Sequence, residues 1–334
     1  MNSSFFFISE AQKRTVIEQA GLKMNLPVQA IEKDLWVTAI LQMLFTLNFA
    51  DKLVFKGGTS LSKVWRVINR LSEDIDIGID REMFGMSGDL TIKQIKTLRK
   101  KSSLFVKKEL CDAMQAKIIE LGLNAYCQVE VEPDGEGDKT YPEPRRIFIR
   151  YNTLFDNMTY LLPVVVLEVG SRSLFEPTAK HKVRSLISEN LPINTDVTDI
   201  EIITAVPEKT FLEKVFLLHE IFTAGGIMEA NRKSRHLYDL ERMMDTDFAL
   251  SAITDDELWR NIHHHRELFT RVSGVDYSSD IRPRISIIPP ESVIEDWKMD
   301  YSAMQRSMIY GDSLPFEMLL ERLRELQNRF HEKK

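Results

Sequence analysis

The sequence predicts a mixed α/β lobe followed by a helical lobe. Up to about residue 200, short apolar runs typical of strands alternate with helical patterns, whereas from Pro207 onward almost every pattern is helical. The chain of 334 residues also exceeds the usual size of one domain. We therefore expect two domains, residues 1–205 with a mixed sheet and residues 206–334 made of helices, with a ligand site in the cleft between them.

The expected elements follow from the spacing of apolar residues. In the first lobe, strands are expected over residues 53–55, 75–79, 125–131, 146–151 and 161–169, and helices over 9–20, 28–49, 59–69 and 90–121. The polar tract 133–144 is expected to form a hairpin loop or a longer excursion. In the second lobe, helices are expected over 207–223, 232–245, 255–272, 291–310 and 315–331.

A glycine pair, Gly57 and Gly58, ends the strand that includes Phe55 and opens the next helix. Glycine allows the backbone to approach a phosphate closely, and a helix beginning near Thr59 would offer unpaired N–H groups to an anion. A glycine pair alone is more often a simple turn. It is not a Walker A loop, because Lys56 precedes the glycines and no Gly-Lys-Ser/Thr follows them.

Two acids, Asp74 and Asp76, alternate with isoleucine on the strand after this helix. Alternate strand residues point to one face, so their Cα atoms would be about 6–7 Å apart. That spacing suits one or two Mg²⁺ ions, although a half-buried strand with a solvated face would show the same pattern. Together with the preceding glycine turn and helix, the pair indicates a metal-dependent nucleotidyl-transfer site.

The sequence KGGTSLSK followed by SEDIDI resembles the AbiEii-type nucleotidyltransferases. These are toxins of bacterial toxin–antitoxin and abortive-infection systems, within the polymerase-β-like nucleotidyltransferase superfamily. The resemblance continues in EKDLWVTAIL, VVVLEVGSRS, PEKTFLEKVFLLHE and RKSRHLYDLERM, and covers roughly residues 9–243. It departs at His236, where many members have Asp, so the role of that position stays open.

The resemblance implies a polymerase-β-like fold and transfer of a nucleotide from a nucleoside triphosphate, with Mg²⁺ or alternatively Mn²⁺ as cofactor. Asp74, Asp76 and Glu168 would hold the metal, and the implied catalytic residues are these three with Lys214 and Asp239. The implied nucleotide-binding residues are Lys56, Gly57, Gly58, Thr59, Ser60, Ser72, Lys214 and Arg235.

Each implied role has a plainer alternative. Glu168 could be an edge-strand acid, and Thr59 and Ser60 could simply cap the helix. Lys214 could be a solvated helix lysine, and Arg235 with Asp239, four residues apart, could form a surface ion pair. His263–His265 are adjacent on a helix and point about 100° apart, so we assign them no metal site.

A run from Lys93 to Lys108 has seven basic residues and no acid, although the formal net charge of the chain is −6. It could line a path for an RNA acceptor or form a solvated helix face. The resemblance favours an RNA acceptor, tRNA before protein, and a cognate antitoxin. The alternatives are a small-molecule nucleotidyltransferase and an inactive nucleotide-binding module. Two cysteines and no long apolar run suggest a cytoplasmic protein without a membrane span.

Overall fold

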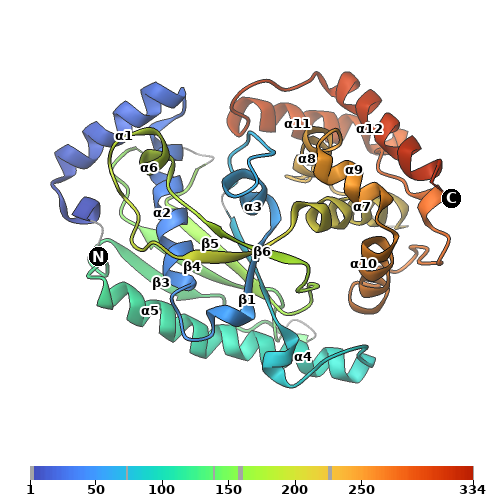
Figure 1. Cartoon of the computed structure of the whole chain (residues 1–334), viewed down its shortest axis with the longest axis horizontal. Coiled ribbons are helices and arrows are strands. Elements are labelled where there is room, and N and C mark those ends of the chain that lie inside the picture. The colour runs from blue at the N-terminus through green and yellow to red at the C-terminus, as the bar shows by residue number, and fades with distance from the viewer. Residues whose placement is uncertain (1–3, 73, 138–139, 157–160, 225–227, 334) are drawn as a thin grey trace. The chain divides into compact units, whose positions relative to one another are not determined.

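The computed structural model describes residues 4–72, 74–137, 140–156, 161–224 and 228–333 (Figure 1). The backbone divides into two compact units. The first comprises Met1–Val64 and Leu71–Ala205, and the second comprises Trp65–Arg70 and Val206–Lys334. The short segment Trp65–Arg70, which was expected in the first domain, thus belongs with the later part of the chain.

The first unit is built on a mixed sheet, which in the described residues has seven strands in the order β3-β4-β5-β2-β1-β7-β6. β2 pairs in parallel with β5 and β1 in parallel with β7, whereas the other neighbours are antiparallel. The expected α/β class with a mixed sheet is confirmed. The strands are β1 (Leu53–Lys56), β2 (Asp74–Ile79), β3 (Cys127–Val131), β4 (Arg145–Tyr151), β5 (Val164–Gly170), β6 (Thr178–Lys182) and β7 (Glu201–Ala205).

Helices of the first unit pack on one face of this sheet, as α2 and α5 show (Figure 1). Burial alternates along the strands, so Ile75 and Ile77 of β2 join Leu167 of β5 in the core on that face. The helices are α1 (Glu10–Met24), α2 (Val28–Leu44), α3 (Gly57–Lys63), α4 (Ile92–Phe105), a π-helical turn η4 (Val106–Leu110), α5 (Cys111–Glu120) and α6 (Leu186–Asn190). Short 3₁₀ turns are η1 (Ser4–Phe7), η2 (Ala50–Lys52) and η3 (Arg81–Phe84).

The sequence-based description of this unit is wrong about the end of one helix and lacks two strands. The helix after the glycines ends at Lys63 instead of Asn69, because Arg66 takes a left-handed backbone (φ 54°) that no α-helix accommodates. The strands β6 and β7 were missed as well. The residues of β6, TAKHK, are polar and partly exposed, as suits an edge strand, and so show no apolar alternation.

The second unit is helical, with Trp297, Tyr238, Tyr301 and Phe330 among its buried side chains. The stretch 255–272 corresponds to α10, which Asp255 caps by accepting hydrogen bonds from the Glu257 and Leu258 backbone N–H groups. The separate helix α9 before it was not expected. The helices are α7 (Pro207–Thr223), α8 (Arg235–Met243), α9 (Asp247–Thr254), α10 (Asp256–Phe269), α11 (Ile294–Ser307) and α12 (Phe316–His331), with 3₁₀ turns η6 (Arg282–Arg284) and η7 (Glu291–Val293).

Candidate active site

The face of the sheet opposite the packed helices carries a row of four charged residues, one from each of four neighbouring strands. The strand register pairs Arg146 with Glu168, Glu168 with Asp76, and Asp76 with Lys56. Register partners point to the same side of a sheet, so the two acids lie between two cations. Asp74 shares this face because it lies two residues before Asp76 on the same strand. The strand pairing therefore brings the three sequence-predicted acids together.

The acids of this row repel one another. The pKa of Glu168 is raised above its ordinary value, first by burial and then by the negative charges of Asp76 and Asp74. The cations Arg146 and Lys56 oppose this rise. Arg146 itself forms an ion pair with Glu132 of 2.6 Å. The excess of negative charge is what a bound cation would relieve.

The donor set fits a divalent metal in its chemistry, since carboxylate oxygens are the ligands that Mg²⁺ and Mn²⁺ prefer. Among the described residues, however, no group of three or more His, Cys, Asp or Glu side chains is arranged so that it could hold a metal ion. The side chains would therefore have to turn toward a common point when an ion binds.

Gly57 contacts the Asp76 carboxylate directly. Its φ is +77°, and a Cβ atom built on it would lie 2.0 Å from the Asp76 Oδ2 atom. Glycine is required at this position for two reasons: the backbone is left-handed, and the Asp76 carboxylate occupies the place of a Cβ atom. The side of Gly57 on which a Cβ would stand thus faces Asp76, an acid of the site.

Thr59 and Ser60 are buried in the first turn of α3, and their hydroxyls contact protein atoms. Thr59 Oγ1 lies 2.7 Å from Ser72 Oγ and also contacts the Asp74 carbonyl oxygen, and Ser60 Oγ donates to the Gly57 carbonyl oxygen at 2.8 Å. The helix begins at Gly57, and its N-cap is Lys56. The alternative that Thr59 or Ser60 caps the helix is therefore wrong. Instead, Thr59 and Ser72 connect α3 to the strand that carries the acids.

The block EKD has a structural role at the start of α2. The Glu32 carboxylate accepts hydrogen bonds from Thr153 and Leu154, and the Lys33 ammonium donates to the carbonyl oxygens of Leu162 and Val164. Asp34 pairs with Lys63 and accepts from the Leu186 backbone N–H. The Glu32 and Lys33 contacts fix the helix to the segment that enters β5, the strand of Glu168, and the Asp34 contacts fix it to α3 and α6.

In the second unit, Lys214 and Asp239 lie in a buried charge cluster. The Asp239 carboxylate pairs with the Lys214 ammonium at 2.9 Å and with the Arg70 guanidinium at 2.7 and 2.8 Å. Burial alone would raise the pKa of Asp239, but the two cations hold it well below its ordinary value. The alternatives of a solvated Lys214 and of a surface pair between Arg235 and Asp239 are therefore wrong.

His236 joins the same cluster, with its Nδ1 atom 3.3 Å from the Lys214 ammonium. Its pKa is lowered well below the ordinary value, first because protein surrounds the ring and then because Lys214 and Arg235 are positive. Burial and the nearby Arg70 also lower the pKa of Lys214. The cluster thus has more cations than acids, which is a favourable environment for an anion.

Two arginines of these sites were missed by sequence reasoning. Arg146 could have been found from the alternation in RRIFIRY, which puts it on the half-exposed face of its strand. Arg70 lies in a segment without regular periodicity, and no local signal connects it to Asp239, which is 169 residues later.

The family comparison decides the class of protein. A family model described as "Nucleotidyl transferase AbiEii toxin, Type IV TA system" matches residues 39–322. The chain belongs to this family. The recognition from the sequence is therefore confirmed, and AbiEii membership makes the protein a nucleotidyltransferase and the toxin of a toxin–antitoxin system, with an antitoxin as its partner.

The AbiEii match includes the acid row, by which we mean Asp74 and the four charged residues from Arg146 to Lys56 on the sheet. It also includes the Arg70 cluster, which consists of Arg70, Lys214, Arg235, His236 and Asp239. No curated protein matches the chain. Among the described residues, no helix is long and apolar enough to cross a membrane.

Proposed function

We propose that this AbiEii protein transfers a nucleotide from a nucleoside triphosphate to an RNA acceptor, with the 3′ end of tRNA favoured over protein. Mg²⁺ is the proposed cofactor, with Mn²⁺ as the alternative ion. The observation that carries the proposal is the strand register that aligns Asp76 with Glu168, with Asp74 on the same face. Three carboxylates on rigid strands are the donor set that such a transfer needs.

In this reaction a hydroxyl oxygen of the acceptor attacks the α-phosphorus, the bond to the β-phosphate breaks, and pyrophosphate leaves. Bound divalent ions would neutralise the triphosphate and lower the pKa of the attacking hydroxyl. Asp74 and Asp76 would hold the ion on the triphosphate, and Glu168 the ion beside the attacking hydroxyl. The raised pKa of Glu168 also makes it the candidate that accepts the hydroxyl proton.

The remaining site residues have supporting roles in the proposal. The Lys214 ammonium would neutralise charge on the triphosphate. Asp239 pairs with this ammonium and Arg70 pairs with Asp239, so both are proposed as positioning residues for Lys214. Lys56, Gly57 and Gly58 are proposed as phosphate contacts because they lie at the end of β1 and the start of α3, next to Asp76, and Arg235 because its charge acts on Lys214. Thr59, Ser60 and Ser72 would act through the backbone that they hold in place.

The exposed lysines of α4 support an RNA acceptor. Lys93, Lys96 and Lys100 are exposed, and the Lys100 ammonium lies 5.2 Å from the centroid of the Tyr141 ring. A cation beside an aromatic ring is an arrangement that suits a phosphate and a base of a single strand.

To test this, the protein is incubated with Mg²⁺, with each α-labelled nucleoside triphosphate in turn, and with total RNA, total protein or an amino-alcohol as the acceptor. We expect label in a tRNA-sized RNA band, dependent on the divalent ion and absent with Asp76→Ala. Asp51→Ala removes an exposed acid of the same unit and should transfer as wild type does. Label on protein or on the amino-alcohol alone would replace the proposed acceptor, and transfer by Asp76→Ala would contradict the acid assignment.

A further inference from the structure

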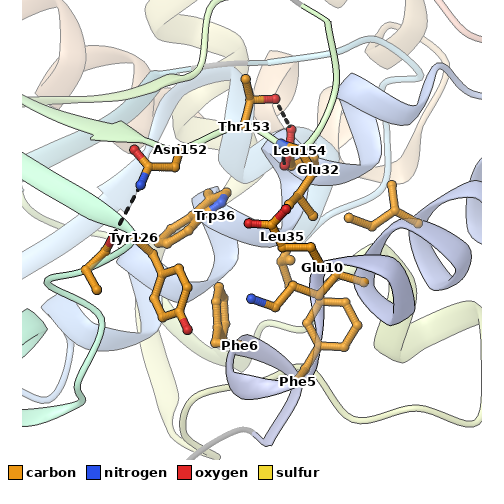
Figure 2. Close-up of a pocket in the computed structure, with 13 residues that line it drawn as sticks. Phe5, Phe6, Glu10, Glu32, Leu35, Trp36, Tyr126, Asn152, Thr153 and Leu154 are labelled. Atoms are coloured by element: carbon orange, nitrogen blue, oxygen red, sulfur yellow. Dashed lines mark hydrogen bonds between the residues drawn. The ribbon is translucent and has the colours of Figure 1, made fainter.

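A cavity of about 180 Å³ lies in the first unit, on the side of the sheet where the helices pack (Figure 2). Its walls come from the start of the chain, from α1 and α2, and from the segments before β3 and after β4. Figure 2 shows the Phe6 and Tyr126 rings and the Trp36 indole around this space. The sheet separates it from the face that carries the acids, so the nucleotide site does not account for it.

One buried cation lines the cavity without a polar partner. Lys13 of α1 is 7 % exposed, and its ammonium lies 4.4 Å from the centroid of the Tyr126 ring. Within the described part of the chain, the Lys13 ammonium has no ion pair and no hydrogen bond. Burial lowers the pKa of Lys13, and the charge of Glu10 opposes this effect only in part. The Lys13 side chain is buried as a whole, whereas its ammonium opens on the cavity, where no anion or acceptor of the described residues accompanies it.

The acids around the cavity do not supply that partner. The Glu32 carboxylate is satisfied by the Thr153 hydroxyl at 2.6 Å and by the Leu154 backbone N–H at 2.8 Å. Glu10 is exposed at the rim, where water and salt screen its charge.

We propose that the cavity is a binding site for a small aromatic carboxylate, with its ring among Phe6, Trp36 and Tyr126 and its carboxylate against the Lys13 ammonium. The volume supports one ring, because an apolar cavity of about 150 Å³ is known to bind benzene. The aromatic walls provide edge and face contacts for that ring. The proposal is independent of the nucleotidyl-transfer reaction, since it uses no residue of the acid row or of the Arg70 cluster.

The test is isothermal titration of the full chain with three probes of the same ring size, namely benzoate, benzyl alcohol and benzylamine. We expect benzoate to bind at least about tenfold more tightly than benzyl alcohol, because a charge-assisted hydrogen bond adds about this factor. Benzylamine should bind least. Nuclear Overhauser contacts between the benzoate ring and the Trp36 indole should locate the ligand in this cavity.

Lys13→Met keeps most of the side-chain volume and removes the charge. We expect it to weaken benzoate binding at least about tenfold while benzyl alcohol affinity stays within about threefold. Lys23→Met, the same change on the same helix, should bind as wild type does, because Lys23 donates instead to the Asn190 carbonyl oxygen.

Three outcomes would overturn the proposal: no saturable benzoate binding to wild type, benzylamine as the tightest ligand, or contacts of the bound ring elsewhere. All three are measured on the wild-type protein, so the proposal stays decidable even if Lys13→Met fails to fold. Unchanged benzoate affinity in a folded Lys13→Met variant would also overturn it.

Discussion

Gly57 shows how one residue without a side chain constrains the acid row. Its left-handed backbone and its contact with the Asp76 carboxylate are separate demands. Gly85, the C-cap residue that follows η3, provides a natural comparison, because its φ is +71° but an added Cβ would meet nothing within 4 Å.

Gly57→Ala should therefore destabilise the protein more than Gly85→Ala does. The backbone conformation costs about 1–2 kcal/mol at either position, and the clash with Asp76 adds to that cost at Gly57 alone. Urea unfolding of both variants measures the difference. The double change Gly57→Ala with Asp76→Ala should recover part of the lost stability, and failure to recover any would show that the carboxylate is not the obstacle.

His236 makes the stability of the protein depend on pH. Its folded pKa lies well below the ordinary value of 6.5, so below about pH 6.5 the unfolded chain binds a proton that the native state does not. The free energy of unfolding then rises with pH, which means that stability is lost on acidification through this window.

His236→Asn should flatten the pH dependence of stability between about pH 5 and pH 7, because it removes this difference in proton binding. Chemical denaturation at several pH values provides the measurement. His264→Asn, on the exposed side of α10, should leave the wild-type profile intact. Identical slopes for wild type and His236→Asn would mean that another group is responsible.

At the scale of elements, the basic run on α4 divides into exposed and engaged residues. Arg99 is half-buried and its charge acts on Glu143 and Arg172, whereas Lys101 donates to the Phe84 carbonyl oxygen at 3.1 Å. Arg99 therefore does not belong to the exposed basic surface of α4.

Changing Lys93, Lys96 and Lys100 together to Glu should weaken RNA binding and reduce its salt dependence. Each lost phosphate contact should lower the log–log slope by about 0.7 for a single strand. Filter binding over a range of salt concentrations measures this, with nucleoside triphosphate binding expected to remain unchanged. The same charge change at Lys180, Lys182 and Arg184 is the control for net charge, with folding checked by circular dichroism because Lys182 and Arg184 pair with Asp199 and Asp196. Equal losses in both triple variants would indicate a general charge effect.

Elements that carry a strong period could be predicted from the sequence, and those that depend on distant partners could not. The helix α7 and the alternating strand β2 follow from their own spacing. By contrast, β6 is polar and becomes a strand because β7 pairs with it. The row from Arg146 to Lys56 likewise depends on register between strands, which no short stretch of sequence encodes.

At the scale of the whole molecule, the second unit is made of two pieces of chain. Arg70 comes from the short piece Trp65–Arg70, and besides Asp239 it forms an antiparallel bridge with Ile309. Breaking a buried pair by removing one partner costs about 3–5 kcal/mol because a buried charge remains uncompensated.

A fragment of residues 206–334 should therefore unfold with lower stability and cooperativity than the same residues in the full chain. Asp239→Asn should destabilise the full chain strongly but change the fragment less, since the fragment has already lost Arg70. Urea unfolding followed by circular dichroism compares the four proteins. A fragment that is as stable as the full chain, and equally sensitive to Asp239→Asn, would show that residues 65–70 contribute little.

The two-piece construction also sets an order of events during synthesis on the ribosome. Arg70 emerges 169 residues before Asp239, which at about 5–20 residues per second is a wait of roughly 8–34 s. Throughout that interval the nascent chain holds an arginine whose counter-charge has not been made. Asp239 is the last of the three residues to be made, so the cluster is completed only late in translation and a toxin terminated before residue 239 lacks it.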